Sequence, residues 1–189
     1  MSGAVVDLSL LIWLAAFFFA YVGFGRGWSK EVISMAGIVL GLFALHEFDN
    51  LLRGTILANL PPDQVFYVQS VIFLIIVFFA YQTRALIGGD VERARRGDSR
   101  EGRDSLQASA LGAIVGFWNG YLISGSLWYF LDINAIAGRY PLDPYVVAPA
   151  SREVVSSLPL YVLAGGPGSN GDLLALAVIV LFLIVLVVI

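Results

Sequence analysis

The chain has no cysteine, a single histidine and few charged residues among its 189 positions. Without cysteine it can form no disulfide, no thiolate metal site and no cysteine nucleophile, and it suits either redox compartment. The single histidine could serve in one catalytic triad at most. Neither an H-E-x-x-H motif nor a phosphate-binding P-loop is present in the sequence. We therefore expect no catalytic site, no metal ion and no cofactor.

Charged residues make up only 13% of the chain, whereas ordinary soluble domains carry about 25%. Hydrophobic residues make up 59%, more than a water-soluble domain of this length could bury. In a membrane, hydrophobic side chains on the outside of a helical bundle can face the lipid. The net charge of -3 gives no reason to expect a nucleic-acid partner. The composition predicts an all-α, polytopic transmembrane helical bundle whose first partner is the lipid bilayer.

Apolar runs long enough to cross a bilayer recur along the chain. A membrane-spanning helix needs about 17–25 mostly apolar residues, and the second and fifth runs only just qualify. The first run lacks the basic flank of a signal peptide and is too long for its apolar core, so we expect it to stay as a helix. The five runs are residues 8–24, 32–48, 65–87, 106–131 and 173–189.

The connection 132–172 is rich in proline and glycine and separates the fifth run from the first four. Inside it, residues 151–163 could form a short amphipathic helix that is capped by Ser151 and lies at the membrane surface. A folded loop without function is the simpler interpretation. The chain then divides into a four-helix membrane domain (1–131), this loop and a C-terminal transmembrane helix (173–189).

Lysine and arginine are unevenly distributed about the predicted spans. With five spans of alternating direction, eight of these residues fall on one face, and only Arg53, Arg139 and Arg152 fall on the other. Basic connections stay in the cytoplasm. This predicts a multi-pass inner-membrane protein with its N-terminus outside, its C-terminus in the cytoplasm and the loop in the periplasm. Arg26 and Lys30, where the first span ends, are expected to anchor it at the headgroups.

Two segments carry a more specific pattern. Asp7 precedes the first run, and residues 19–31 read FAYVGFGRGWSKE, followed by Gly37 and Gly41. Residues 112–122 read GAIVGFWNGYL. These segments resemble the colicin V production (CvpA) family, whose pattern is an early Asp, a Gly-x-x-Arg-Gly turn, a Glu that opens the second helix, and a glycine-rich fourth helix.

The resemblance covers about residues 6–131 and implies a multi-spanning inner-membrane protein. Members of this family are named for a requirement in colicin V toxin production and are linked to envelope function. No chemical reaction is assigned to the family, so the resemblance implies none for this chain. The present chain departs from the usual four-helix core after residue 131, where it adds the long loop and the fifth run.

Small residues recur at helical spacing within the predicted spans. Helices in lipid associate through close packing, which such stripes allow. We interpret the stripes as packing surfaces within one chain, and a homo-oligomer seam through the fourth run stays open as the alternative. The glycines expected at helix contacts are Gly23, Gly27, Gly37, Gly41, Gly112, Gly116 and Gly120.

Few polar groups fall within the runs. Glu31 is expected to open the second helix, where a carboxylate suits the helix dipole, and it could pair with Arg26. His46, Glu47 and Asn119 are candidates for a polar pathway, although contact with interfacial water explains the first two equally well. We expect no acidic or basic residue deep in a span, which argues against a proton-driven pump.

Three functions fit these features. The first is a CvpA-like membrane protein without a catalytic site, involved in colicin V production or export or in envelope homeostasis. The second is an accessory subunit of a larger membrane complex, with the fifth run as a docking helix. The third is a small oligomeric channel or transporter, lined by Asn119 and the glycine stripe. All three predict a membrane-protein partner or a homo-oligomer.

Overall fold

The computed structural model describes residues 7–82, 101–149, 153–166 and 168–188. These residues form an all-α structure, as predicted, and no strand occurs among them. The helices of this described part are α1 (Leu8–Arg26), α2 (Trp28–Glu47), α3 (Asp49–Gly54), α4 (Pro62–Gln82), α6 (Glu101–Ile133), α7 (Glu153–Ser156), α8 (Pro159–Ala164) and α9 (Asp172–Val188).

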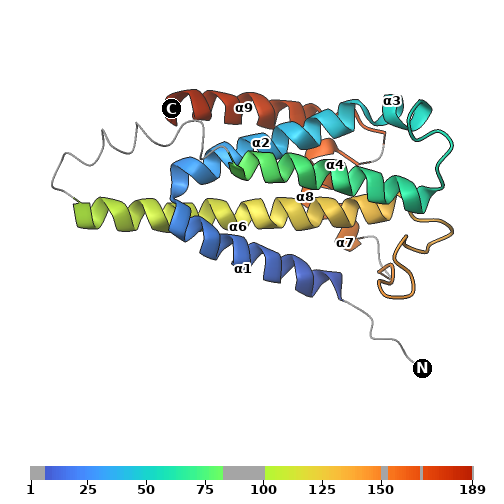
Figure 1. Cartoon of the computed structure of the whole chain (residues 1–189), viewed down its shortest axis with the longest axis horizontal. Helices are drawn as coiled ribbons and strands as arrows, with labels where there is room; N and C mark the ends of the chain where they lie inside the picture. The colour runs from blue at the N-terminus through green and yellow to red at the C-terminus, as the bar shows by residue number, and fades with distance from the viewer. Residues whose placement is uncertain (1–6, 83–100, 150–152, 167, 189) are drawn as a thin grey trace.

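Within the described ranges, four helices are long and apolar enough to cross a membrane, namely α1, α2, α4 and the Leu106–Ile133 part of α6. The prediction of a transmembrane helical bundle is thereby confirmed. At 1.5 Å per residue the 17 residues of α9 cover about 25 Å, slightly less than a hydrocarbon core of about 30 Å. Helix α9 packs along α2 and α8 (Figure 1), and a complete crossing by α9 stays a prediction.

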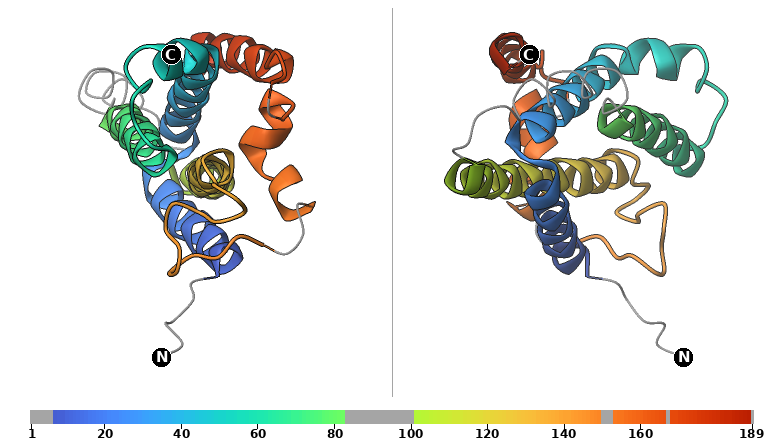
Figure 2. Two further views of the ribbon diagram at one scale, coloured as in Figure 1. Left: turned by 90° about the vertical axis from the view of Figure 1, so that its right-hand side faces the viewer. Right: turned by 60° about the vertical axis from the view of Figure 1, so that its left-hand side comes forward.

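The helices surround α6, which lies at the centre of the molecule (Figure 2). Helix α1 packs against α6 on one side, and α2 and α4 lie on another. Helices α7 and α8 cross beside α6 on the side where α9 also lies. At the end of the bundle that we call the Arg26 end, α1 and α4 finish and α2 begins; α3 marks the opposite end, called the Arg53 end (Figure 1).

Local signals fix both ends of α1. The Asp7 carboxylate accepts hydrogen bonds from the backbone N–H and the hydroxyl of Ser9, and these bonds lower the pKa of Asp7 below its ordinary value. Gly27 alone separates α1 from α2, with a φ of 82° that a side chain would disfavour. Its N–H donates to the Gly23 carbonyl at 2.9 Å. This one-residue turn brings Arg26 close to the first turn of α2.

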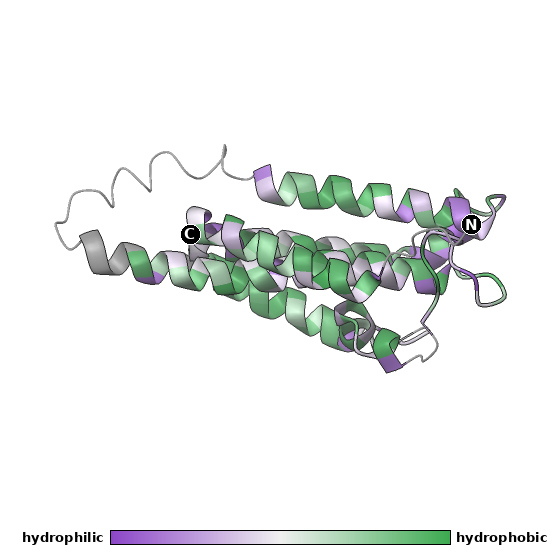
Figure 3. Ribbon diagram, turned by 90° about the horizontal axis from the view of Figure 1, so that it is seen from below, coloured by the Kyte–Doolittle hydropathy of each residue, from purple (hydrophilic) through white to green (hydrophobic). Residues whose placement is uncertain are grey.

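Large apolar side chains cover the outside of the bundle rather than its interior alone. On α1, Phe17 and Phe18 are 65% and 61% exposed. Hydrophobic residues run along the helices, while hydrophilic ones gather mainly towards the ends (Figure 3). This pattern suits helices that are solvated by lipid in the middle and by water at both ends.

The prediction of one amphipathic helix over residues 151–163 is wrong. The chain forms two short helices, α7 and α8, because Pro159 begins α8 and cannot continue a preceding helix. Ser151, the predicted cap, lies outside the described residues. Leu158, Pro159 and Leu160 are buried, so the α8 region is packed against the bundle and does not rest on its surface.

Candidate functional site

The contact between α1 and α6 is a seam of backbone against backbone. A Cβ atom added at Gly112 would lie 2.8 Å from the Gly27 carbonyl carbon, and one at Gly116 would lie 3.1 Å from the Gly23 Cα. At Gly120 the corresponding atom would lie 2.8 Å from the Ala16 Cα, well inside van der Waals contact. Only glycine permits this approach. The α6 stripe is therefore covered by α1 of the same chain, on the face that a homo-oligomer seam would need.

A second contact of this kind joins α2 to α4. A Cβ atom added at Gly37 would lie 2.8 Å from the Ala80 Cβ, and one at Gly41 would lie 2.5 Å from the Ile76 Cγ2. The structure thus places six of the seven glycines selected from the sequence directly at helix contacts. The seventh, Gly27, makes the turn between α1 and α2, and its backbone atoms lie next to Gly112 in the seam.

A buried ion pair lies near the Arg26 end. The Arg26 Nη1 donates to Glu31 Oε1 at 2.7 Å, and the Glu31 side chain is fully buried at 0% exposed. Glu31 Oε2 accepts two further hydrogen bonds, from the Tyr81 hydroxyl at 3.1 Å and from the Asn119 Nδ2 at 2.8 Å. We call Arg26, Glu31, Ser34, Tyr81 and Asn119 the Glu31 cluster.

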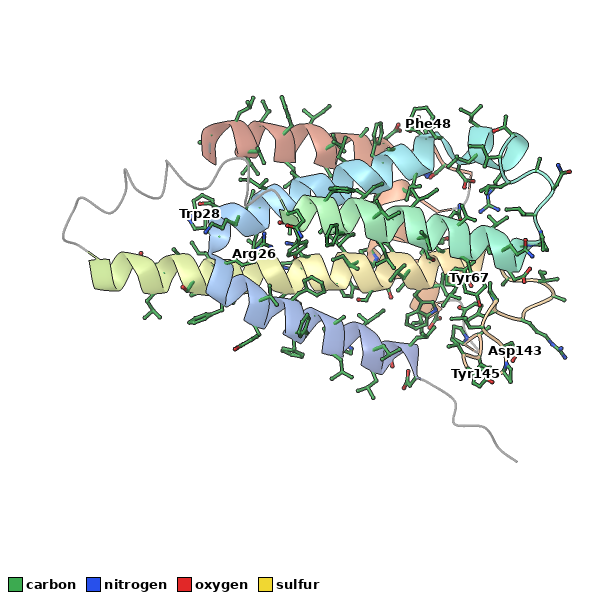
Figure 4. The ribbon with its side chains drawn as sticks, viewed as in Figure 1. Arg26, Trp28, Phe48, Tyr67, Asp143 and Tyr145 are labelled. Carbon is green, nitrogen blue, oxygen red and sulfur yellow. The ribbon has the colours of Figure 1, made fainter. Side chains whose placement is uncertain are left out.

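Arg26, labelled in Figure 4 near the end of α1, is itself held from several sides. Its Nη2 donates to the Ser34 hydroxyl at 3.3 Å and to the Tyr81 carbonyl at 3.2 Å. The guanidinium carbon lies 4.3 Å from the centre of the Tyr81 ring, which is a cation–π distance. The cluster therefore joins α1, α2, α4 and α6 through one charged pair.

This arrangement extends the sequence interpretation. Glu31 does lie in the first turn of α2, and the pair with Arg26 forms. The sequence did not show, however, that the Glu31 side chain is enclosed by the helical bundle at this end of α2. The participation of Tyr81 was missed, because nothing in the sequence shows that the last turn of α4 returns to the first turn of α2.

A second polar group, the Arg53 cluster, lies at the opposite end and forms a closed ring. Arg53 Nε donates to both carboxylate oxygens of Asp49, at 3.0 and 2.8 Å, and its Nη1 donates to Asn134 Oδ1 at 3.1 Å. Asn134 donates to Gln69 Oε1 at 2.8 Å, and Gln69 donates back to Asp49 at 2.7 Å. The ring ties α3, α4 and the end of α6 together.

A cavity of about 420 Å³ borders this ring, and His46, Arg53 and Tyr129 contribute to its walls. The His46 Nε2 lies 3.2 Å from the Ser169 carbonyl oxygen. Glu47 is exposed and is not among the residues that line the cavity. The sequence could have suggested the Asp49–Arg53 pair from its four-residue spacing, whereas the role of Asn134 has no sequence signal.

The two clusters are separate in the described part of the chain. Asn119 belongs to the Glu31 cluster, and His46 lies beside the Arg53 cluster. Between Ser34 and His46, α2 presents Ile38 and Leu42, both 0% exposed and part of the apolar core. The predicted polar residues therefore do not line one continuous pathway. Among the described residues, no three His, Cys, Asp or Glu side chains come together as a metal site.

These features define a class of protein, a multi-pass α-helical membrane protein whose helices are joined by glycine contacts and buried polar clusters. A comparison with protein families then gives the group within this class. The family described as Colicin V production protein matches residues 8–141. The chain belongs to this family, as the resemblance predicted, and the match extends ten residues beyond the predicted boundary at 131. Comparisons with curated proteins and with solved structures gave no match.

Proposed function

We propose that this chain is a non-catalytic inner-membrane protein that acts in colicin V production or export, or in envelope homeostasis. Membership of the family carries the proposal. In the structure, Arg26–Glu31 and Arg53–Asp49 pair internally and join helices to one another, which gives these charged residues a structural role. The oligomeric channel has less support, since the glycine stripe is covered by α1 and Asn119 is engaged by Glu31.

Complementation tests the proposed function. In a colicin V-producing host whose own family member is deleted, expression of this chain should restore the zone of inhibition around colonies and resistance to detergent. Gly25→Ala should restore both, because a Cβ at Gly25 meets no atom within 4 Å. Failure of the wild-type chain to restore either property, despite normal membrane insertion, would contradict the proposal.

The orientation is a second part of the proposal. Arg26 and Lys30 lie at the Arg26 end, where α4 also ends and α6 begins (Figure 1). The sequence that links these two helices, residues 83–100, carries five arginines. By the positive-inside rule this end faces the cytoplasm, and the N-terminus lies outside.

Reporter fusions should show this orientation directly. Alkaline phosphatase, which is active only in the periplasm, should be active when fused before residue 7 and inactive when inserted between residues 83 and 100. A fluorescent protein that matures only in the cytoplasm should be bright after residue 189. The reverse pattern of activities would refute the orientation while leaving the fold unchanged.

A further inference from the structure

A second cavity, of about 520 Å³, lies on the side of the bundle where α9 packs. We call it the side groove. It is bounded by α2, α6, α8 and α9, and its walls include Val39, Trp118, Val162 and Ala177. Trp118 and Val162 are 52% and 50% exposed, so the groove opens outwards between the helices. Figure 2 shows the four helices around this side of α6.

The α6 residues that line the side groove, including Trp118 and Leu122, lie within the Leu106–Ile133 part of α6 that is long and apolar enough to cross a membrane. Pro159, which begins α8 and lines the groove, contacts α6 at Gly125. Gly125 precedes Ile133, the end of α6, by eight residues or about 12 Å along the helix. Helix α8 therefore enters the membrane region from the Arg53 end and forms a wall of the groove below the membrane surface.

Hydrogen bonding at the break between α7 and α8 agrees with this depth. Irregular backbone is tolerated within a membrane only where its polar groups find partners in the protein. The Tyr121 hydroxyl donates to the Ser157 carbonyl at 3.2 Å, and the Ser157 hydroxyl donates to the Val154 carbonyl at 2.7 Å. The polar groups at the groove wall thus satisfy one another, which leaves a surface suited to an apolar occupant.

The volume distinguishes between apolar occupants. A cavity of about 520 Å³ is within the range of small-molecule sites, about 300–1,000 Å³. A transmembrane helix about 10 Å wide takes up on the order of 800 Å³ for every 10 Å of its length, so only side chains from one face of a helix could enter the groove. A single extended hydrocarbon chain can enter it whole. We propose that the side groove binds one acyl chain of a membrane phospholipid, held between α6 and α9.

Native mass spectrometry of the purified full chain, with one phosphatidylethanolamine added back after delipidation, tests this proposal. Ala177→Phe, which places a ring in the groove, should lower the fraction of protein that retains one lipid at least fivefold. Val162→Trp, on the α8 wall, should do the same, so the result does not depend on one variant folding. Val180→Phe is the control, because Val180 lies on α9, is 45% exposed and does not line the groove.

Three outcomes would overturn the proposal. Equal lipid retention by the groove variants and by Val180→Phe would show only general lipid contact with the outer surface. Absence of any retained lipid on the wild-type chain would show an empty groove. A second protein chain that binds the wild type and is lost in both groove variants would show that a protein occupies it. Monodisperse elution of each variant confirms that the comparison is between folded proteins.

Discussion

Replacing Arg26 with methionine should lower the free energy of unfolding by about 3–5 kcal/mol, the range for removing one partner of a buried ion pair. The loss is large because the Glu31 side chain, at 0% exposed, would lose the guanidinium that pairs with it at 2.7 Å and would stay buried without that partner. The hydrogen bonds from Tyr81 and Asn119 remain, but neither donor carries a charge. Reversible unfolding in mixed detergent micelles, followed by circular dichroism, measures the difference.

Two further variants test the physical reason for this loss. Arg26→Met combined with Glu31→Gln should be more stable than Arg26→Met alone, because the buried group is then neutral and can still accept a hydrogen bond. Arg139→Met is the exposed control, since its side chain is 81% exposed and lies 3.9 Å from Asp143, so the change should stay within about 1 kcal/mol. Similar losses for Arg26→Met and Arg139→Met would show that the Glu31 cluster does not stabilise the fold.

Replacing Gly23 with alanine should destabilise the protein by about 1–3 kcal/mol, the usual cost of overpacking a close contact. The new methyl group would overlap the Gly112 carbonyl oxygen on α6. Backbone atoms form both sides of this contact, so no side chain can rotate away, and the two helices must separate. Thermal melting in a mild detergent gives the sign and size of the effect.

Gly25→Ala provides a matched control only two residues away in the same helix. A Cβ at Gly25 meets nothing within 4 Å, and alanine favours helix over glycine by up to about 1 kcal/mol. This variant should therefore melt at the same temperature as the wild type or slightly above it. Opposite signs for the two substitutions are expected, and a similar loss at both positions would mean that helix propensity, not the seam, sets the effect.

The fold could largely be predicted from the sequence because lipid imposes a simple rule. Each long apolar run must form a helix that satisfies its own backbone, so α1, α2, α4 and α6 follow from length and composition. The α7–α8 region could not be predicted in this way. Its residues 151–163 have the pattern of a surface helix, but the structure breaks the helix before Pro159 and buries that proline against α6.

The candidate site shows a different limit. The glycines at the helix contacts were visible because their four-residue spacing is a local property, as was the Arg26–Glu31 pair across a short turn. The partners of Glu31 on α4 and α6 lie 50 and 88 positions away along the chain. No local pattern encodes such neighbours. For the same reason, Asn119 looked like part of a polar pathway although it is a donor to Glu31.

Central to this account is that α1 packs on α6 of the same chain. The natural absence of cysteine allows a clean test with Phe17→Cys and Phe117→Cys, whose rings lie 5.6 Å apart between their centres. A protease site inserted between residues 83 and 100 would separate α1 from α6 after cleavage. Treatment in membranes with a short thiol cross-linker should leave the two fragments of one chain joined at monomer size. Phe17→Cys with Phe182→Cys on α9 is the negative control for reagent reach, because α9 follows the protease site and lies on the opposite side of the bundle from α1 (Figure 1).

The predicted result is a single cross-linked monomer that survives cleavage, with no dimer. A cross-linked dimer seen before cleavage would show that α1 lies on α6 of a second copy, and it would contradict the account; cleavage would then reduce it to monomer-sized pairs of fragments from two chains.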